Sequence, residues 1–398
     1  MKYWRMNIGV YAVVWSLIIG MLTAAYLNLV NWVIHLVWKI GPAVLGISSK
    51  WYPFIACIPL GFLIGYLNKR LGDYPLIIEE VLVDVRMKGK INYQQWWKSF
   101  VLGLLVLGAG GSVGPEASTT VLTSSMVNWL GDRIRWFHFR QQAGKRGNIW
   151  WEKMTKQELA EAPQFGKLFK DRTQKKMLLF FLIVVGVIGA TIIFILFPEE
   201  GVFGIHHQVI QWQWVNLLTA IPTFLVGMGF GWFFVRLGNW TSLLNTHFGK
   251  VWQGGIFGLI LAASSLLTGL VLFSGEFQIV PFSEEALKMS IPFLLMVAFG
   301  KSIITNLGFS MGWRGGTIFP AIFASLALGS ACALLLPGDL RVNAIIVLSA
   351  SLTMILERSV LTIIIILLLV PIELAPVVIP ACFAVNFILK HVQTKKQE

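Results

Sequence analysis

Two short segments with the same pattern could bind an anion through their backbone. GGSVGP occupies residues 110–115 and GGTIFP occupies residues 315–320. In each motif, three residues separate a Gly-Gly pair from a proline, and an apolar stretch follows the proline. Proline suits the first turn of a helix, where its missing N–H costs no hydrogen bond. Each segment therefore predicts a helix that begins at the motif, directly after a Gly-Gly bend.

The first residues of these two helices are the predicted anion ligands. Amides at a helix N-terminus have no partner within the helix, carry partial positive charge and bind anions. The amides concerned belong to Ser112, Val113, Gly114, Thr317, Ile318 and Phe319. The bends that present them are formed by Gly110, Gly111, Pro115, Gly315, Gly316 and Pro320. Two such ends that converge would hold a weakly hydrated anion such as a halide, without a metal or a cofactor. The alternative is that both motifs only kink helices for packing.

Glu116 adds an ionisable group to the first motif only. It follows Pro115, whereas Ala321 follows Pro320 in the second motif. An acidic side chain in the first turn of a helix can simply complement the helix dipole. An ionisable residue at membrane depth is also a functional candidate by default, here a gate or a proton carrier. Both interpretations of Glu116 stay open.

The rest of the chain predicts the membrane that these motifs need. The 398 residues are 56% hydrophobic and only 13% charged, against about 25% charged in soluble proteins. A spanning helix needs about 20 apolar residues, so we expect roughly ten membrane helices in an all-α integral membrane protein. The apolar stretches are 8–40, 51–68, 96–109, 113–130, 177–198, 213–237, 253–274, 290–312, 316–336, 341–355 and 373–392.

The positions of the charges predict the topology. The net charge is +13, and Lys and Arg gather at both termini, in 69–98 and in 132–176. The positive-inside rule then places both termini in the cytoplasm of a multi-pass cell-membrane protein, and nucleic acid is not an expected partner. The segment 199–212 has acidic residues and no Lys or Arg, which suits an external loop. Cys57, Cys332 and Cys382 have no spacing that predicts a disulfide or a metal site.

Two halves of the chain echo each other. The segment 58–74 resembles 224–240, with Gly61, Gly65 and Arg70 matching Gly227, Gly231 and Arg236 at one constant spacing. The two Gly-Gly motifs follow in the same order. We therefore predict membrane repeats at 1–205 and 206–398, with a site between pseudo-symmetric halves. The polar segment 131–177 lies in the first repeat, either as a plain cytoplasmic loop or as a docking site for a lipid headgroup or a partner.

The motifs resemble those of a known family. GSVGP (111–115) resembles the G-(K/R)-E-G-P motif of the CLC chloride channels and chloride/proton antiporters, and GGTIFP resembles their G-x-F-x-P motif. KSIITNLGFSMGWRGGTIFPAIFASLALGSA (301–331) is similar to their helix M to helix N passage, and LGDYP (71–75) sits where they have G-S-G-I-P. The resemblance implies a homodimer of inverted repeats, built of tilted and broken helices in a lipid bilayer, with one chloride or small-anion pathway per subunit.

The chain departs from the family at the residues that couple anions to protons. The family's gating glutamate falls on Val113, and its anion-contacting serine falls on Gly72 with Asp73 beside it. No tyrosine lies beyond Tyr93 to match the family's pore tyrosine. These departures favour passive or uncoupled anion transport. The alternatives are an anion/proton antiporter that uses Glu116, or a non-conducting structural relative. No cluster of ionisable residues predicts an enzyme.

Overall fold

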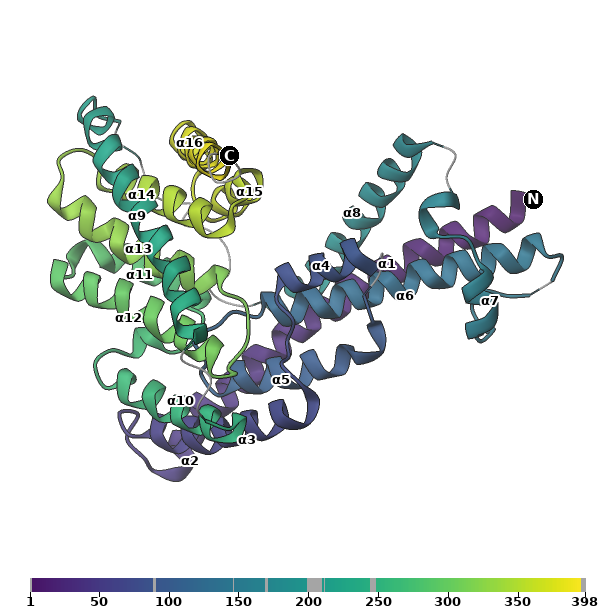
Figure 1. Cartoon of the computed structure of the whole chain (residues 1–398), viewed down its shortest axis with the longest axis horizontal. Coiled ribbons are helices and arrows are strands. Elements are labelled where there is room, and N and C mark those ends of the chain that lie inside the picture. Colours follow the sequence, from purple (N-terminus) through teal and green to yellow (C-terminus); the bar gives the residue numbers. More distant parts are fainter. Residues whose placement is uncertain are drawn as a thin grey trace. The chain divides into compact units, whose positions relative to one another are not determined.

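The computed structural model describes the chain except residues 1, 89–90, 146, 169–170, 199–209, 211, 244–247 and 395–398. Across the described residues the secondary structure is helical and no strand forms, which confirms the all-α prediction. Figure 1 labels the helices. Their bounds are α1 (Lys2–His35), α2 (Gly41–Leu45), α3 (Tyr52–Leu71), α4 (Ile78–Lys88), α5 (Trp96–Gly108), α6 (Glu116–Gln142), α7 (Lys156–Glu161), α8 (Arg172–Leu196), α9 (Val215–Leu243), α10 (Lys250–Ser265), α11 (Ile279–Glu285), α12 (Ile291–Ser310), α13 (Ile318–Leu335), α14 (Leu340–Leu356), α15 (Ser359–Leu369) and α16 (Ala375–Thr394).

Seven helical segments of the described chain are long and apolar enough to cross a membrane. They are Asn7–Leu45, Tyr52–Leu71, Thr173–Leu196, Val215–Leu243, Ile291–Ser310, Ile318–Leu335 and Ile372–His391. The predicted stretch 253–274 is wrong as one element, because α10 ends at Ser265 and the Thr268 side chain accepts a hydrogen bond from Leu270 N in a short turn. Helix α15 has 11 residues and was not predicted as a separate stretch. The predicted external loop falls largely outside the described residues.

The chain forms two compact units. The first unit comprises Met1–Val33, Pro75–Val101 and Ala117–Glu199, and the second comprises Ile34–Tyr74, Leu102–Glu116 and Glu200–Glu398. These units do not follow the predicted boundary near residue 205, so the division into two repeats stays a prediction. Both Gly-Gly motifs belong to the second unit.

In the first unit, the polar segment 131–177 is folded. Its first residues continue α6 to Gln142, and α7 follows. The Trp136 side chain is fully buried, and its Nε1 donates to Glu158 Oε2 of α7 at 2.9 Å. Arg133 donates to the carbonyl of Ile149 at 2.6 Å. The interpretation of this segment as a plain loop is therefore wrong, while a docking role stays untested.

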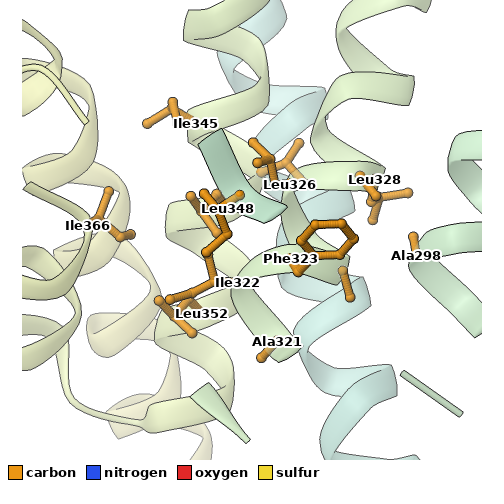
Figure 2. Close-up of a cluster of buried hydrophobic side chains, with 14 of the residues drawn as sticks. Ala298, Ala321, Ile322, Phe323, Leu326, Leu328, Ile345, Leu348, Leu352 and Ile366 are labelled. Atoms are coloured by element: carbon orange, nitrogen blue, oxygen red, sulfur yellow. The ribbon is translucent and has the colours of Figure 1, made fainter. Parts of the chain in front are cut away.

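The core of the second unit surrounds α13. Figure 2 shows Ile322, Phe323 and Leu326 of α13 in a cluster with Leu348 and Leu352 of α14. Small residues alternate with these large ones on α13, and Ala321, Ala324 and Ala327 have no exposed surface. Small side chains let membrane helices approach closely and gain packing contacts, because lipid offers no hydrophobic driving force between them. This packing holds the N-terminus of α13, and with it the second motif, at a fixed position.

The glycines that segments 58–74 and 224–240 share lie where two helices pack closely. A Cβ atom at Gly61 or Gly65 of α3 would meet the backbone of α10 at Gly254 and at Val251. A Cβ atom at Gly227 or Gly231 of α9 would meet the backbone of α14. The matched glycines thus perform the same task in two different helix pairs of the second unit.

Candidate functional site

The two Gly-Gly motifs meet in the second unit. Gly114 N donates to Gly316 O at 2.7 Å, and Gly316 N donates to Gly114 O at 2.8 Å. This pair forms an isolated antiparallel bridge between the motifs. As predicted, a helix begins at each motif: α6 starts at Glu116, directly after Pro115, and α13 starts at Ile318, with Pro320 in its first turn.

The Glu116 side chain binds the N-terminus of α13. Its Oε1 accepts hydrogen bonds from Ile318 N at 2.9 Å and from Phe319 N at 3.1 Å. These are the first two residues of α13, where the partial positive charge of the helix end is concentrated. A carboxylate oxygen therefore occupies a position that the sequence predicts for an anion. Glu116, Ile318 and Phe319 are partly exposed.

The motif glycines make room for this carboxylate. A Cβ atom at Gly114 or at Gly316 would overlap the carboxyl group of Glu116. A Cβ atom at Gly315 would overlap the side chain of Val113, which is 1% exposed. Gly315 and Gly316 thus leave the space that the side chains of Val113 and Glu116 occupy.

The expectation of free motif amides needs a correction. Ile318 N and Phe319 N are bonded to Glu116, and Gly114 N is used in the bridge. Val113 N donates to Gly111 O at 2.8 Å within its own bend. Buried backbone donors are almost always satisfied, and here the bend and the carboxylate satisfy them. A role of the Ser112, Val113, Gly114, Thr317, Ile318 and Phe319 amides in anion binding stays a prediction.

The first bend is held by groups that lie far away in the sequence. Gly110 has φ +83°, a conformation that favours glycine. Trp38 Nε1 donates to Gly108 O at 2.9 Å, and Phe273 N donates to Gly110 O at 3.0 Å. Cys57 Sγ donates to Ala109 O at 3.4 Å. Carbonyls at the C-terminal end of α5 thereby find partners that the helix itself cannot supply. The sequence gives no signal for Trp38 or Phe273, because each lies in an apolar segment without a motif.

Lys301 is a buried basic side chain that supports the same bend. Its side chain is fully buried on α12, and Nζ donates to Leu270 O at 3.0 Å, to Leu272 O at 3.0 Å and to Phe273 O at 2.6 Å. Its Nζ holds the carbonyls of the 270–273 turn, and Phe273 N of the same turn donates to Gly110 O. A lysine within an apolar stretch was the sequence signal for it.

Gly72 and Asp73 lie beside the residues that lead into the second motif. Gly72 has φ +99°. The Asp73 carboxylate accepts from Lys250 Nζ at 2.7 Å, and its backbone carbonyl accepts from Arg314 at 2.8 Å. Asn68 Nδ2 donates to Gly312 O at 2.7 Å. Residues that line a cavity of about 220 Å³ here include Asn68, Asp73, Lys250 and Arg314. The charged side chains of Asp73, Lys250 and Arg314 therefore lie together beside this stretch of the chain.

Comparisons with known proteins agree with this architecture. A family model described as voltage gated chloride channel matches residues 166–390, more than half of the chain. No curated protein sequence matches the chain. Among solved structures, a slow cyanobacterial Cl⁻/H⁺ antiporter is similar with a TM-score of 0.68 and 17% identity, over 97% of this chain and 95% of that one.

Two further structures are similar in fold. A CLC-type fluoride/proton antiporter has a TM-score of 0.67 and 18% identity, over 95% of each chain. A eukaryotic CLC transporter has a TM-score of 0.64 and 14% identity, over 95% of this chain and 71% of that one. At these identities the likeness concerns the fold alone, and it confirms the predicted all-α membrane architecture. By its family match, the chain is a member of the voltage gated chloride channel family.

Proposed function

We propose that this chain moves small anions such as chloride across a membrane, along a pathway that passes the 110–116 and 315–320 motifs. We propose further that the Glu116 carboxylate closes this pathway by occupying the anion position on α13. The observation that carries the proposal is the pair of hydrogen bonds from Ile318 N and Phe319 N to Glu116 Oε1. A halide and a carboxylate use the same donors, so only one of them can be bound at a time.

The transport that we propose is passive. Val113 stands where the family has its ionisable gate, and a valine side chain cannot carry a proton. A second candidate is anion/proton exchange, which is favoured by the finding that the group on the α13 amides is itself a carboxylate. A proton on Glu116 would weaken its hold on these amides and release it from the site.

Glu116→Gln tests the gate. Hydrogen bonds to an ionised group exceed those to a neutral one by about 1–2 kcal/mol, so anion flux at neutral pH should rise about fivefold to thirtyfold. Wild-type flux should rise as the pH falls, because protonation neutralises Glu116, whereas flux through Glu116→Gln should not depend on pH. The measurement is chloride efflux from liposomes that contain the purified protein, with proton movement recorded in parallel.

The matched control is Glu373→Gln, which neutralises an exposed carboxylate outside the two motifs. It should leave flux and pH dependence unchanged. If protons moved in fixed proportion to chloride in the wild type, and this proton movement were lost in Glu116→Gln, the result would support anion/proton exchange. Equal flux and equal pH dependence in wild type and Glu116→Gln would exclude the gate. Absence of flux in all three folded proteins would favour the non-conducting relative.

A further inference from the structure

The first unit contains a large cavity with an apolar lining. Its volume is about 490 Å³, and its walls come from α1, α5 and α6 and the segment that precedes α5. No residue of the 110–116 or 315–320 motifs lines it, and no charged side chain does. Ligand pockets in proteins have volumes of about 300–1,000 Å³, with apolar and aromatic walls and a few convergent polar groups. The cavity has both the size and the character of such a pocket.

Three lining residues carry a hydroxyl group, and that of Tyr93 is bonded to Asp132, which leaves Ser125 and Tyr26. Ser125 of α6 is 2% exposed, and its Oγ has no hydrogen-bond partner within the described residues. A serine inside a helix usually donates to the carbonyl four residues earlier, as Ser264 donates to Ile260 in this chain. The second hydroxyl belongs to Tyr26 of α1, which is 3% exposed and has Ser118 as its polar neighbour. A buried hydroxyl without a partner is unfavourable, so Ser125 calls for a polar group from a ligand.

The mouth of the cavity consists of apolar residues. Leu22 and Ala25 of α1 and Trp96 of α5 line the cavity and are exposed at its edge. Leu22 and Ala25 lie well inside Asn7–Leu45, a segment long and apolar enough to cross a membrane. A mouth within such a segment suits an occupant that comes from the bilayer.

We propose that this cavity binds a membrane-dissolved apolar molecule that carries one hydroxyl group, of the class of long-chain alcohols. The hydroxyl would bond to Ser125 and Tyr26, and the apolar body would lie against the aromatic walls. A charged headgroup does not fit, because no charged side chain lines the cavity to receive it. A plain acyl chain would fill the volume but would leave Ser125 without a partner.

Photolabelling of the full chain in phosphatidylcholine nanodiscs tests this proposal. The probe is a twelve-carbon primary alcohol with a diazirine in its chain, and the labelled residues are mapped by mass spectrometry. We expect label on α1 and α6 around Ala25 and Ser125. Excess dodecan-1-ol should displace the probe, and dodecane at the same concentration should not.

Two variants make the test specific. Ala25→Trp places a large side chain at the mouth and should abolish the label, whereas the control Val10→Trp, at an exposed position of the same helix, should keep it. Ser125→Ala keeps the space but removes the hydroxyl, so the preference for dodecan-1-ol over dodecane should fall about threefold to tenfold. This readout does not depend on anion flux.

Three results would overturn the proposal. One is label that persists in Ala25→Trp, which would place the probe outside the cavity. Another is displacement by dodecane as effective as by dodecan-1-ol in the wild type, which would make the occupant a plain hydrocarbon chain. The third is an unchanged preference in Ser125→Ala. Should Ala25→Trp fail to fold, Ser125→Ala decides alone.

Discussion

At the residue scale, a carboxylate and a halide make the same demand on the amides of Ile318 and Phe319. Both are acceptors that profit from the partial positive charge of a helix N-terminus. The carboxylate differs because it is tethered to α6 and because a proton can neutralise it. In the gate that we propose, the tethered carboxylate acts at a high effective concentration, so an anion would displace it only when the anion is abundant or Glu116 is protonated.

Gly316→Ala tests the proposed gate by a second route. A Cβ atom at Gly316 would overlap the Glu116 carboxyl group, so the side chain must leave the α13 amides. We expect the flux of Gly316→Ala to be raised and independent of pH, as in Glu116→Gln. The flux of the double variant should resemble that of either single variant. Both changes remove the same interaction, and effects of residues in contact do not add.

The control for this prediction is Gly131→Ala, on the same helix as Glu116, where a Cβ atom meets nothing within 4 Å. Its chloride efflux should match that of the wild type. Additive effects of Glu116→Gln and Gly316→Ala in the liposome measurement would contradict the shared mechanism.

At the scale of elements, the close contact of α3 and α10 should be sensitive to a single methyl group. A Cβ atom at Gly61 would meet the Gly254 carbonyl and the Trp313 ring, and Trp313 Nε1 donates to that same carbonyl at 3.0 Å. Overpacking costs about 1–3 kcal/mol. Gly61→Ala should therefore lower the free energy of unfolding by about that amount, measured by thermal unfolding of the purified protein.

Gly229→Ala on α9 is the matched control. It makes the same change within a helix, but a Cβ atom there meets nothing within 4 Å. Alanine is favoured over glycine in a helix by about 0.5–1 kcal/mol, so Gly229→Ala should be neutral or slightly stabilising. If Gly61→Ala and Gly229→Ala changed the free energy of unfolding equally, the close contact of α3 with α10 would not be sensitive to a methyl group.

The contact of α6 with α7 should respond to acid. Hydrogen bonds from Lys145, from the Trp136 indole and from Thr155 lower the pKa of Glu158 to about 2. The pKa of an unfolded glutamate is about 4.3, so the folded state holds its proton less tightly. The stabilisation is therefore complete above pH about 4.3 and is lost as the pH falls toward 2.

Glu158→Gln should remove this dependence. The unfolding temperature of the wild type should fall between pH 5 and pH 2 more steeply than that of Glu158→Gln. Glu161→Gln, which changes an exposed carboxylate on the same helix α7, should keep the wild-type profile. Identical profiles of wild type and Glu158→Gln would show that this carboxylate does not hold α7 on α6.

At the scale of the whole molecule, the apolar pattern predicts where helices lie but not which of them touch. The membrane character, the two motif-led helix starts and the meeting of 110–115 with 315–320 could all be derived from residue types and spacing. The partners of the first bend could not, because Trp38 and Phe273 contribute a ring N–H to Gly108 and a backbone N–H to Gly110, groups without a motif of their own. The bond from Glu116 to α13 also could not, since its partners are amides and carry no side-chain signature.

Element lengths were predicted less well where polar residues are sparse. Glu357 and Arg358 separate α14 from α15, yet the side chains on both sides of this pair are mostly apolar. The break after Ser265 is equally hidden, because the turn that follows is made by backbone groups and by Thr268. The homodimer and the relation between the two repeats stay predictions that rest on the family resemblance.

The bridge between Gly114 and Gly316 has a consequence for the order in which the protein matures. Glu116 and its partner Ile318 are separated by 202 residues. Contacts so distant in sequence form late, because the chain between them must lose its freedom before they contribute. During synthesis, the first motif therefore waits unpaired until the second has left the ribosome. Until then Gly114 lacks its bridge partner, and the anion pathway that we propose is incomplete.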